Sequence, residues 1–210
     1  MCKKILLLFL TLMMSLSVCG CSRPFSDRDM DIYEKIHKYY SKMESYSCDL
    51  DFTVFSNKTE NRYFVSQSSV LPNKFYTRVT DPNGTFSVTT ITNGELTKTT
   101  ADGSEYSLTI PNQEYVSLLF VNNFFDAYYS SEETSISVDS SATKSAKTIL
   151  DVFVSENDLC IEKVSMAIDN KTLFPHTLTV YDTDGKKLIL AKYENFKYNN
   201  KIDDSVFNIN

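Results

Sequence analysis

Apolar and polar residues alternate with two different periods along this chain, and the change of period separates helices from strands. Over residues 29–45, apolar residues recur at spacings of three and four with charged residues between them, which predicts an amphipathic helix. From Tyr46 the period becomes two, which predicts a half-buried strand. The apolar positions of this strand are Cys48, Leu50, Phe52 and Val54.

Short β-rich runs separated by turn signals occupy most of the remaining chain. The turn signals combine Pro, Asn, Asp and Gly, as in Asn93-Gly94 and in Asp184-Gly185, and they favour tight hairpins. The predicted strands span residues 62–71, 75–80, 85–92, 96–100, 106–110, 147–155, 159–168, 178–181 and 187–198.

A second helix is predicted over residues 111–130, where Pro111 suits the first helical position and a broad apolar face follows. The Ser-, Glu- and Thr-rich residues 130–145 are interpreted as a flexible insertion. Together these elements predict a mainly β (α+β) fold, in which two helices cover the concave face of one large curved antiparallel sheet. Since no repeat or second composition block appears, residues 29–210 are expected to form a single domain.

The N-terminus has the features of an export signal. Lys3 and Lys4 precede an apolar run over residues 5–18, which is shorter than the roughly 20 residues of a membrane span. The run ends on Gly20-Cys21, which resembles a bacterial lipoprotein signal. This resemblance implies that residues 1–20 are removed and that Cys21 carries lipid, with residues 21–28 as a short tether. A plain secretory signal, a membrane span and lipidation at Cys19 are the alternatives.

Charge and cysteine content restrict the partners of the mature chain. The formal net charge is −6, and removal of Lys3 and Lys4 would make it −8, so a nucleic-acid partner is not expected and membrane attachment would depend on the lipid. Of five cysteines, only Cys48 and Cys160 would remain in the body. They could pair outside the cell, but two buried thiols are favoured because a domain of this size needs no disulfide.

Catalytic signatures are missing from the sequence. It contains no nucleophile elbow, zinc-protease motif, P-loop or dinucleotide-binding glycine pattern. We therefore predict no catalytic residue, no metal ligand and no cofactor. The two histidines, His37 and His176, and the acid pairs are interpreted as structural or solvent-exposed residues. The acid pairs are Asp49/Asp51, Glu132/Glu133 and Asp203/Asp204.

Aromatic residues are abundant, with 13 Tyr and 14 Phe but no Trp. One cluster falls in and around the second predicted helix, where it could pack the core, line a ligand cavity or bind a partner. Core packing is the favoured interpretation. The cluster comprises Phe120, Phe124, Phe125, Tyr128 and Tyr129.

The body resembles the LolA/LolB-like lipoprotein-carrier superfamily over most of residues 30–210. The resemblance is clearest at residues 71–76, in Asn93-Gly94, and over residues 169–175 and 202–207. It implies an open half-barrel closed by helices.

A lipidated chain cannot carry cargo across an aqueous gap, so the chain is more similar to spore germination lipoproteins of the GerS type. That resemblance implies a non-catalytic lipoprotein on the outer face of the cytoplasmic membrane or of the spore membrane. Its partner would be a CwlD-like N-acetylmuramoyl-L-alanine amidase, with the zinc and the chemistry belonging to that enzyme. The alternative is a protein that binds lipid or acyl ligands in an apolar cavity between sheet and helices. Neither interpretation identifies the residues that bind a partner or ligand.

Overall fold

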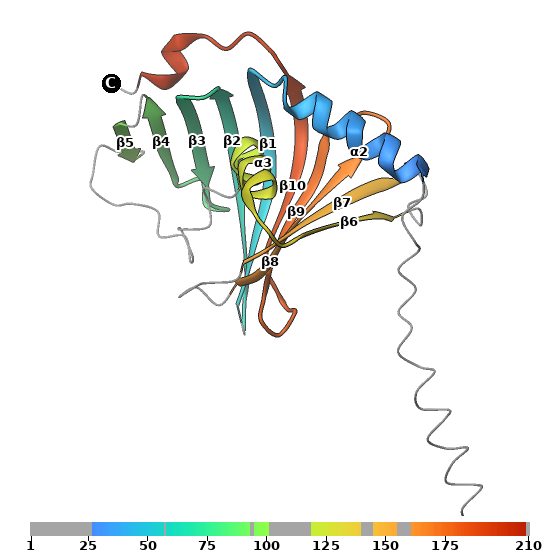
Figure 1. Cartoon of the computed structure of the whole chain (residues 1–210). Coiled ribbons are helices and arrows are strands. Elements are labelled where there is room, and N and C mark those ends of the chain that lie inside the picture. The colour runs from blue at the N-terminus through green and yellow to red at the C-terminus, as the bar shows by residue number, and fades with distance from the viewer. Residues whose placement is uncertain are drawn as a thin grey trace, which may run out of the picture.

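One antiparallel sheet organises the molecule (Figure 1). The computed structural model describes residues 27–56, 58–92, 95–100, 119–139, 145–154 and 161–208. Within these ranges the sheet has ten strands in the order β5-β4-β3-β2-β1-β10-β9-β8-β7-β6. The strands are β1 Ser45–Phe55, β2 Glu60–Val70, β3 Lys74–Thr80, β4 Phe86–Thr92, β5 Glu95–Thr100, β6 Thr134–Asp139, β7 Lys147–Phe153, β8 Ile161–Asp169, β9 Pro175–Asp182 and β10 Lys187–Tyr198.

Two meanders build this sheet, and they join where the first strand pairs with the last. β1 pairs with β2 along its whole length and with β10 on its other side. Sequence neighbours pair everywhere else, which suits the tight turns that the sequence predicted. Gly84 and Gly185 occupy turns at φ +87° and +74°, where a side chain would be strained. The predicted fold class is confirmed.

Two predictions about the strands need correction. Residues 130–145 were interpreted as a flexible insertion, but β6 lies within them and pairs with β7 as an edge strand. Its sequence is short and half of its residues are Ser or Thr, so the apolar alternation is limited to Ile136 and Val138. β9 begins at Pro175 instead of residue 178, because proline is tolerated at the first residue of a strand. The predicted strand over residues 106–110 lies outside the described residues.

The helices α2 Asp27–Tyr40 and α3 Val121–Ser130 lie on the concave face of the sheet (Figure 1). α2 follows the upper ends of the strands on the β10 side, and α3 lies in front of β1 and β2. α2 begins two residues earlier than predicted. The predicted helix over residues 111–130 is confirmed from Val121 onward, and residues 111–118 lie outside the described part.

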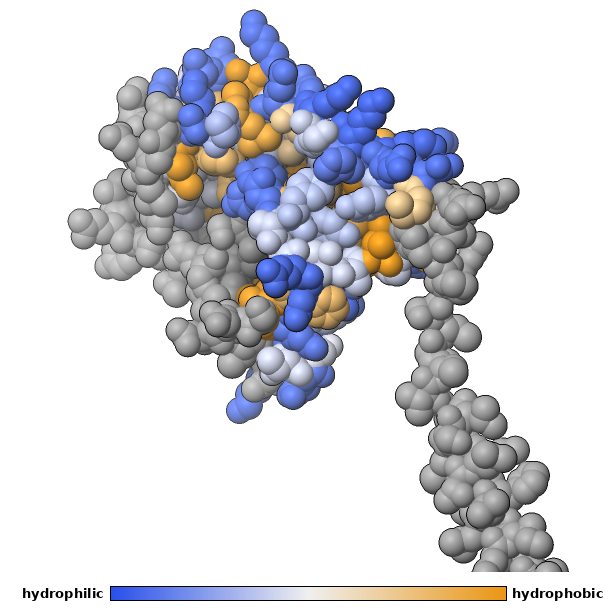
Figure 2. All heavy atoms as spheres, in the orientation of Figure 1, coloured by the Kyte–Doolittle hydropathy of each residue, from blue (hydrophilic) through white to orange (hydrophobic). Residues whose placement is uncertain are grey.

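Aromatic side chains join the two helices to each other. The rings of Tyr40 and Phe125 stack with centroids 4.0 Å apart, and His37 meets Tyr129 edge to face at 4.9 Å. Figure 2 shows hydrophilic side chains along the outer side of α2 and paler ones where the helices meet. The helices therefore cover the core with a mixed aromatic and polar surface.

The C-terminal segment runs from β10 across the upper ends of the strands toward β4 (Figure 1). Its short 3₁₀ helix, η2 Asp204–Phe207, contacts β3 and β4. The Asp203 carboxylate accepts a hydrogen bond from the Ser205 N–H at 2.9 Å, and the ammonium of Lys74 pairs with Asp204 at 2.7 Å. Phe207 is buried. This segment gives the acid pair Asp203/Asp204 a structural role.

Candidate functional site

The concave face of the sheet is filled by side chains in the described part of the molecule. Four of the five predicted cluster aromatics are buried, and Phe124 is only 1% exposed. Tyr129 is the exception at 43% exposed. The cluster therefore packs the core, as the favoured interpretation predicted. The four buried members are Phe120, Phe124, Phe125 and Tyr128.

A polar patch interrupts the apolar concave face on β2 and β3. Gln67 and Thr77 face each other across the two strands, and Ser69 lies one step further along β2. Gln67 Nε2, Ser69 Oγ and Thr77 Oγ1 are buried without a hydrogen-bond partner among the described residues. Unpaired polar atoms are a poor lining for an acyl chain, so this region does not favour the lipid-binding alternative.

The histidines and acid pairs singled out in the sequence do not converge into a catalytic or metal-binding group in the described part of the chain. Among the described residues, no group of three or more His, Cys, Asp and Glu side chains could hold a metal ion. Asp51 accepts two hydrogen bonds from the guanidinium of Arg62, at 2.6 and 2.7 Å. Asp49 accepts hydrogen bonds from Ser66 and Asn195. These carboxylates are held in surface contacts between strands.

The cysteines divide between the described and the remaining parts of the chain. Cys48 is a free, buried thiol on β1, and burial raises its pKa far above the ordinary range. A neutral buried thiol is a poor nucleophile. The free thiol of Cys48 agrees with the favoured interpretation for that residue. Cys21 and Cys160 lie outside the described residues, so lipidation of Cys21 and a buried thiol at Cys160 stay predictions.

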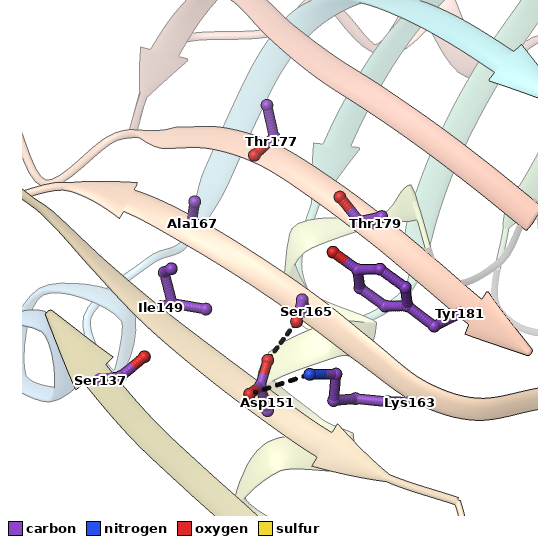
Figure 3. Close-up of a pocket in the computed structure, with 9 residues that line it drawn as sticks. All are labelled: Ser137, Ile149, Asp151, Lys163, Ser165, Ala167, Thr177, Thr179 and Tyr181. Atoms are coloured by element: carbon purple, nitrogen blue, oxygen red, sulfur yellow. Dashed lines mark hydrogen bonds and ion pairs between the residues drawn. The ribbon is translucent and has the colours of Figure 1, made fainter. Parts of the chain in front are cut away.

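The convex face carries a polar groove across β6, β7, β8 and β9, with a volume of about 280 Å³ (Figure 3). Small residues form its floor, and longer side chains rise beside them. Register explains the grouping, because Asp151 lies opposite Ser165 and Ser165 lies opposite Thr179 on three neighbouring strands. The lining residues are Ser137, Ile149, Asp151, Lys163, Ser165, Ala167, Thr177, Thr179 and Tyr181.

Asp151 is the centre of the groove. Its side chain is only 13% exposed, and it accepts hydrogen bonds from the hydroxyls of Ser135 and Ser165. The Lys163 ammonium lies 3.5 Å from the Asp151 carboxylate and 5.1 Å from the centroid of the Tyr181 ring. The groove therefore holds one cation and one anion that largely cancel.

A second groove, of about 270 Å³, lies beside the C-terminal half of α2. Tyr39 and Tyr198 stack at 4.0 Å and form part of its apolar floor with Leu173. Burial and the neighbouring Tyr198 raise the pKa of Tyr39 to about 12, so the phenol stays neutral. Three lysines form its rim, and no described carboxylate is within ion-pair distance of them. They are Lys35, Lys38 and Lys42.

Sequence reasoning missed both grooves. The residues that line the convex groove are ordinary outward-facing residues, most of them polar, and only the pairing of four strands groups them. The lysines of α2 were visible as the polar face of a helix, but not their position beside Leu173, which lies far along the chain. In the described part of the chain, no helix has the length and apolar character needed to cross a membrane.

The curved antiparallel sheet and its two covering helices form an open half-barrel. The family model described as "Sporulation protein YdcC-like" matches residues 2–207. The chain therefore belongs to the YdcC-like sporulation protein family. Among curated proteins, none has a sequence that matches this one.

Solved structures show the same fold at low sequence identity. An uncharacterized conserved protein from Thermus thermophilus has 10% identity and a TM-score of 0.50, over 87% of this chain and 94% of that chain. The LolA superfamily protein NE2245 from Nitrosomonas europaea has 12% identity and a TM-score of 0.43, over 86% and 97%.

The chain is also similar to part of the structure of the CwlD amidase from Clostridioides difficile in complex with the GerS lipoprotein. The identity there is 20% and the TM-score 0.38, over 80% of this chain and 95% of that chain. This chain spans about 59% of the length of MucB, as seen in the complex of MucB with MucA(peri). At these identities the likeness concerns the fold.

Proposed function

We propose that this chain is a non-catalytic, membrane-anchored lipoprotein that binds and supports a cell-wall amidase during spore formation or germination. Lipid on Cys21 would hold it on the outer face of the cytoplasmic membrane or of the spore membrane. The observation that carries the proposal is membership of a sporulation protein family over residues 2–207, a range that includes Gly20-Cys21.

The described structure supports a binding role over a catalytic one. Several of its carboxylates are engaged in ion pairs, as for Asp51 with Arg62 and Asp204 with Lys74. The aromatic side chains that fill the concave face favour a protein partner over an enclosed acyl ligand. The amidase as partner, with its own zinc, is what the sequence resemblance to spore germination lipoproteins implies for this chain.

Purification from sporulating cells tests the proposal. The full chain with a C-terminal tag is extracted in mild detergent, and the proteins and lipids that accompany it are identified by mass spectrometry. We expect an N-acetylmuramoyl-L-alanine amidase to co-purify, and we expect the purified pair to cleave cortex peptidoglycan faster than the amidase alone.

A matched variant separates binding from anchoring. Cys21→Ala should still bind the purified amidase, since the lipid supplies location and not the contact surface. Recovery of folded protein without any amidase would overturn the partner assignment. One equivalent of bound lipid in place of an amidase would favour the lipid-binding alternative.

A further inference from the structure

The convex groove contains polar groups that the fold itself does not use. Ser165 and Thr179 point away from the core, yet they are only 9% and 7% exposed, because longer side chains stand around them (Figure 3). In the described part of the chain, the hydroxyls of Ser137, Thr177 and Thr179 have no hydrogen-bond partner. These hydroxyls lie in the groove and are available to a ligand.

The charges in the groove select against a charged ligand. The Lys163 ammonium and the Asp151 carboxylate already face each other at 3.5 Å. The attraction of an added ion to one of these groups would therefore be offset by its repulsion from the other. A neutral molecule with several hydroxyl and amide groups can instead donate to Asp151 and accept from Lys163 and the hydroxyls. Carbohydrate has this composition.

Size and shape fit one unit of a longer polymer. About 280 Å³ is just below the roughly 300–1,000 Å³ typical of small-molecule sites. The groove lies on an open sheet face, so the chain of a polymer could leave it at either end. Ile149 and the ring of Tyr181 add apolar surface on which the methyl group of an acetamide can pack.

We propose that this groove binds a neutral N-acetylated sugar unit of a wall glycan, which is N-acetylglucosamine and not the anionic N-acetylmuramic acid. The groove would hold the polymer on the face of the sheet opposite the two helices. Presentation of that glycan to the amidase is a consequence that rests on the proposed function, whereas sugar binding by the chain alone does not.

Titration with peptide-free glycan tests the site. The probes are N-acetylglucosamine trimer and a soluble glycan of alternating N-acetylglucosamine and N-acetylmuramic acid, added to the full chain in detergent and followed by calorimetry. We expect binding of at least one probe. Thr179→Val keeps the shape but removes a hydroxyl, and it should weaken binding about fivefold. Asp151→Asn should weaken it more than about tenfold.

Thr53→Val is the matched control. Thr53 on β1 and Thr179 on β9 both pair with Leu190 of the intervening strand β10. The two threonines therefore lie on the same face of the sheet and at the same level along the strands, but Thr53 is outside the groove. This control should bind as tightly as the unchanged chain. Ser137→Ala, at the exposed rim, provides a second groove variant if Thr179→Val does not fold.

Two results would overturn the inference. The first is the absence of binding to both probes by the unchanged chain at millimolar concentration. The second is equal weakening by Thr179→Val and Thr53→Val. If the groove variants instead lose the amidase while neither probe binds, the groove is a protein contact. That result would leave the proposed function standing and remove the glycan site.

Discussion

Tyr46 and Tyr193 lie on the two central strands, and their hydroxyls reach the same end of α3. The Val121 N–H donates to Tyr46 Oη at 3.1 Å, and Tyr193 Oη donates to the Leu119 carbonyl at 2.7 Å. The first residues of a helix need acceptors for their N–H groups, and Phe120 provides no side-chain cap. Burial raises the pKa of both phenols well above 10, so both stay protonated.

Tyr46→Phe should therefore lower the free energy of unfolding by about 1–3 kcal/mol, because the ring remains while a buried N–H loses its acceptor. Urea denaturation followed by circular dichroism measures the change. The control is Tyr76→Phe. Tyr76 lies on β3, on the face of the sheet opposite to that of Tyr46, and its substitution should change the free energy of unfolding by less than about 0.5 kcal/mol. Equal effects of the two substitutions would contradict the capping role of Tyr46.

Asp169 organises the β8–β9 turn through its carboxylate. Oδ1 accepts hydrogen bonds from the backbone N–H groups of Lys171 and Thr172, both at 2.9 Å. Partial burial alone would raise the pKa of Asp169, but these hydrogen bonds outweigh it and the pKa lies below 3.8. Because the folded state has the lower pKa, the stabilisation exists above about pH 4 and is lost as the pH falls through the folded value.

Asp169→Asn should consequently be less stable than the unchanged chain at pH 7, and this difference should shrink toward zero below about pH 3. Thermal unfolding of both proteins at the two pH values measures it. A difference of the same size at both values would show that the carboxylate charge does not contribute to the turn.

At the scale of elements, α2 and α3 are joined by rings more than by charges. Tyr40 and Phe125 are both buried and stack at 4.0 Å with an interplanar angle of 25°. A double-mutant cycle with Tyr40→Leu and Phe125→Leu should give a coupling of about 0.5–1.5 kcal/mol. In the matched cycle, Tyr39→Leu takes the place of Tyr40→Leu. The ring of Tyr39 stacks on Tyr198 instead of on Phe125, so the coupling energy of this second cycle should be close to zero. Similar couplings in both cycles would mean that the stack has no specific energy.

The strands were predictable where one face is buried, because burial imposes a period of two on the sequence. In β1 every second residue from Tyr46 to Val54 is buried, and the alternation alone locates that strand. β6 lacked this signal, since no residue of this edge strand is fully buried. η2 was missed because four residues are too few to show a helical period.

The convex groove could not have been predicted in this way. Its central residues, Asp151, Ser165 and Thr179, belong to three consecutive strands, and their grouping depends on the register of the two pairings between those strands. A shift of one residue in either pairing would turn one of them to the other face. Sequence patterns specify which face a residue occupies more readily than which residue lies beside it.

At the scale of the whole molecule, the chain is acidic, while the lysines beside the α2 groove form a local basic rim. The net charge predicts repulsion from anionic lipid, and the rim is a weak opposing attraction that salt would screen. α2 starts at Asp27, so the stretch from Cys21 to Ser26 spans at most roughly 20 Å. Lipid on Cys21 would therefore hold the half-barrel close to the bilayer.

Cys21→Ala should release the protein from the membrane fraction while leaving its thermal unfolding unchanged, because Cys21 precedes the first described helix and the body has its own core. Fractionation in about 0.5 M salt excludes retention through the lysine rim, and metabolic labelling with palmitate should mark the unchanged chain but not Cys21→Ala. Cys19→Ala is the matched control: it keeps the signal and Gly20-Cys21, so it should stay labelled and membrane-bound. If Cys19→Ala lost the label and Cys21→Ala kept it, the acceptor would be Cys19. If both variants stayed in the membrane fraction without label, the apolar segment would be uncleaved. Attachment to the membrane would then depend on residues 5–18 instead of on a lipid.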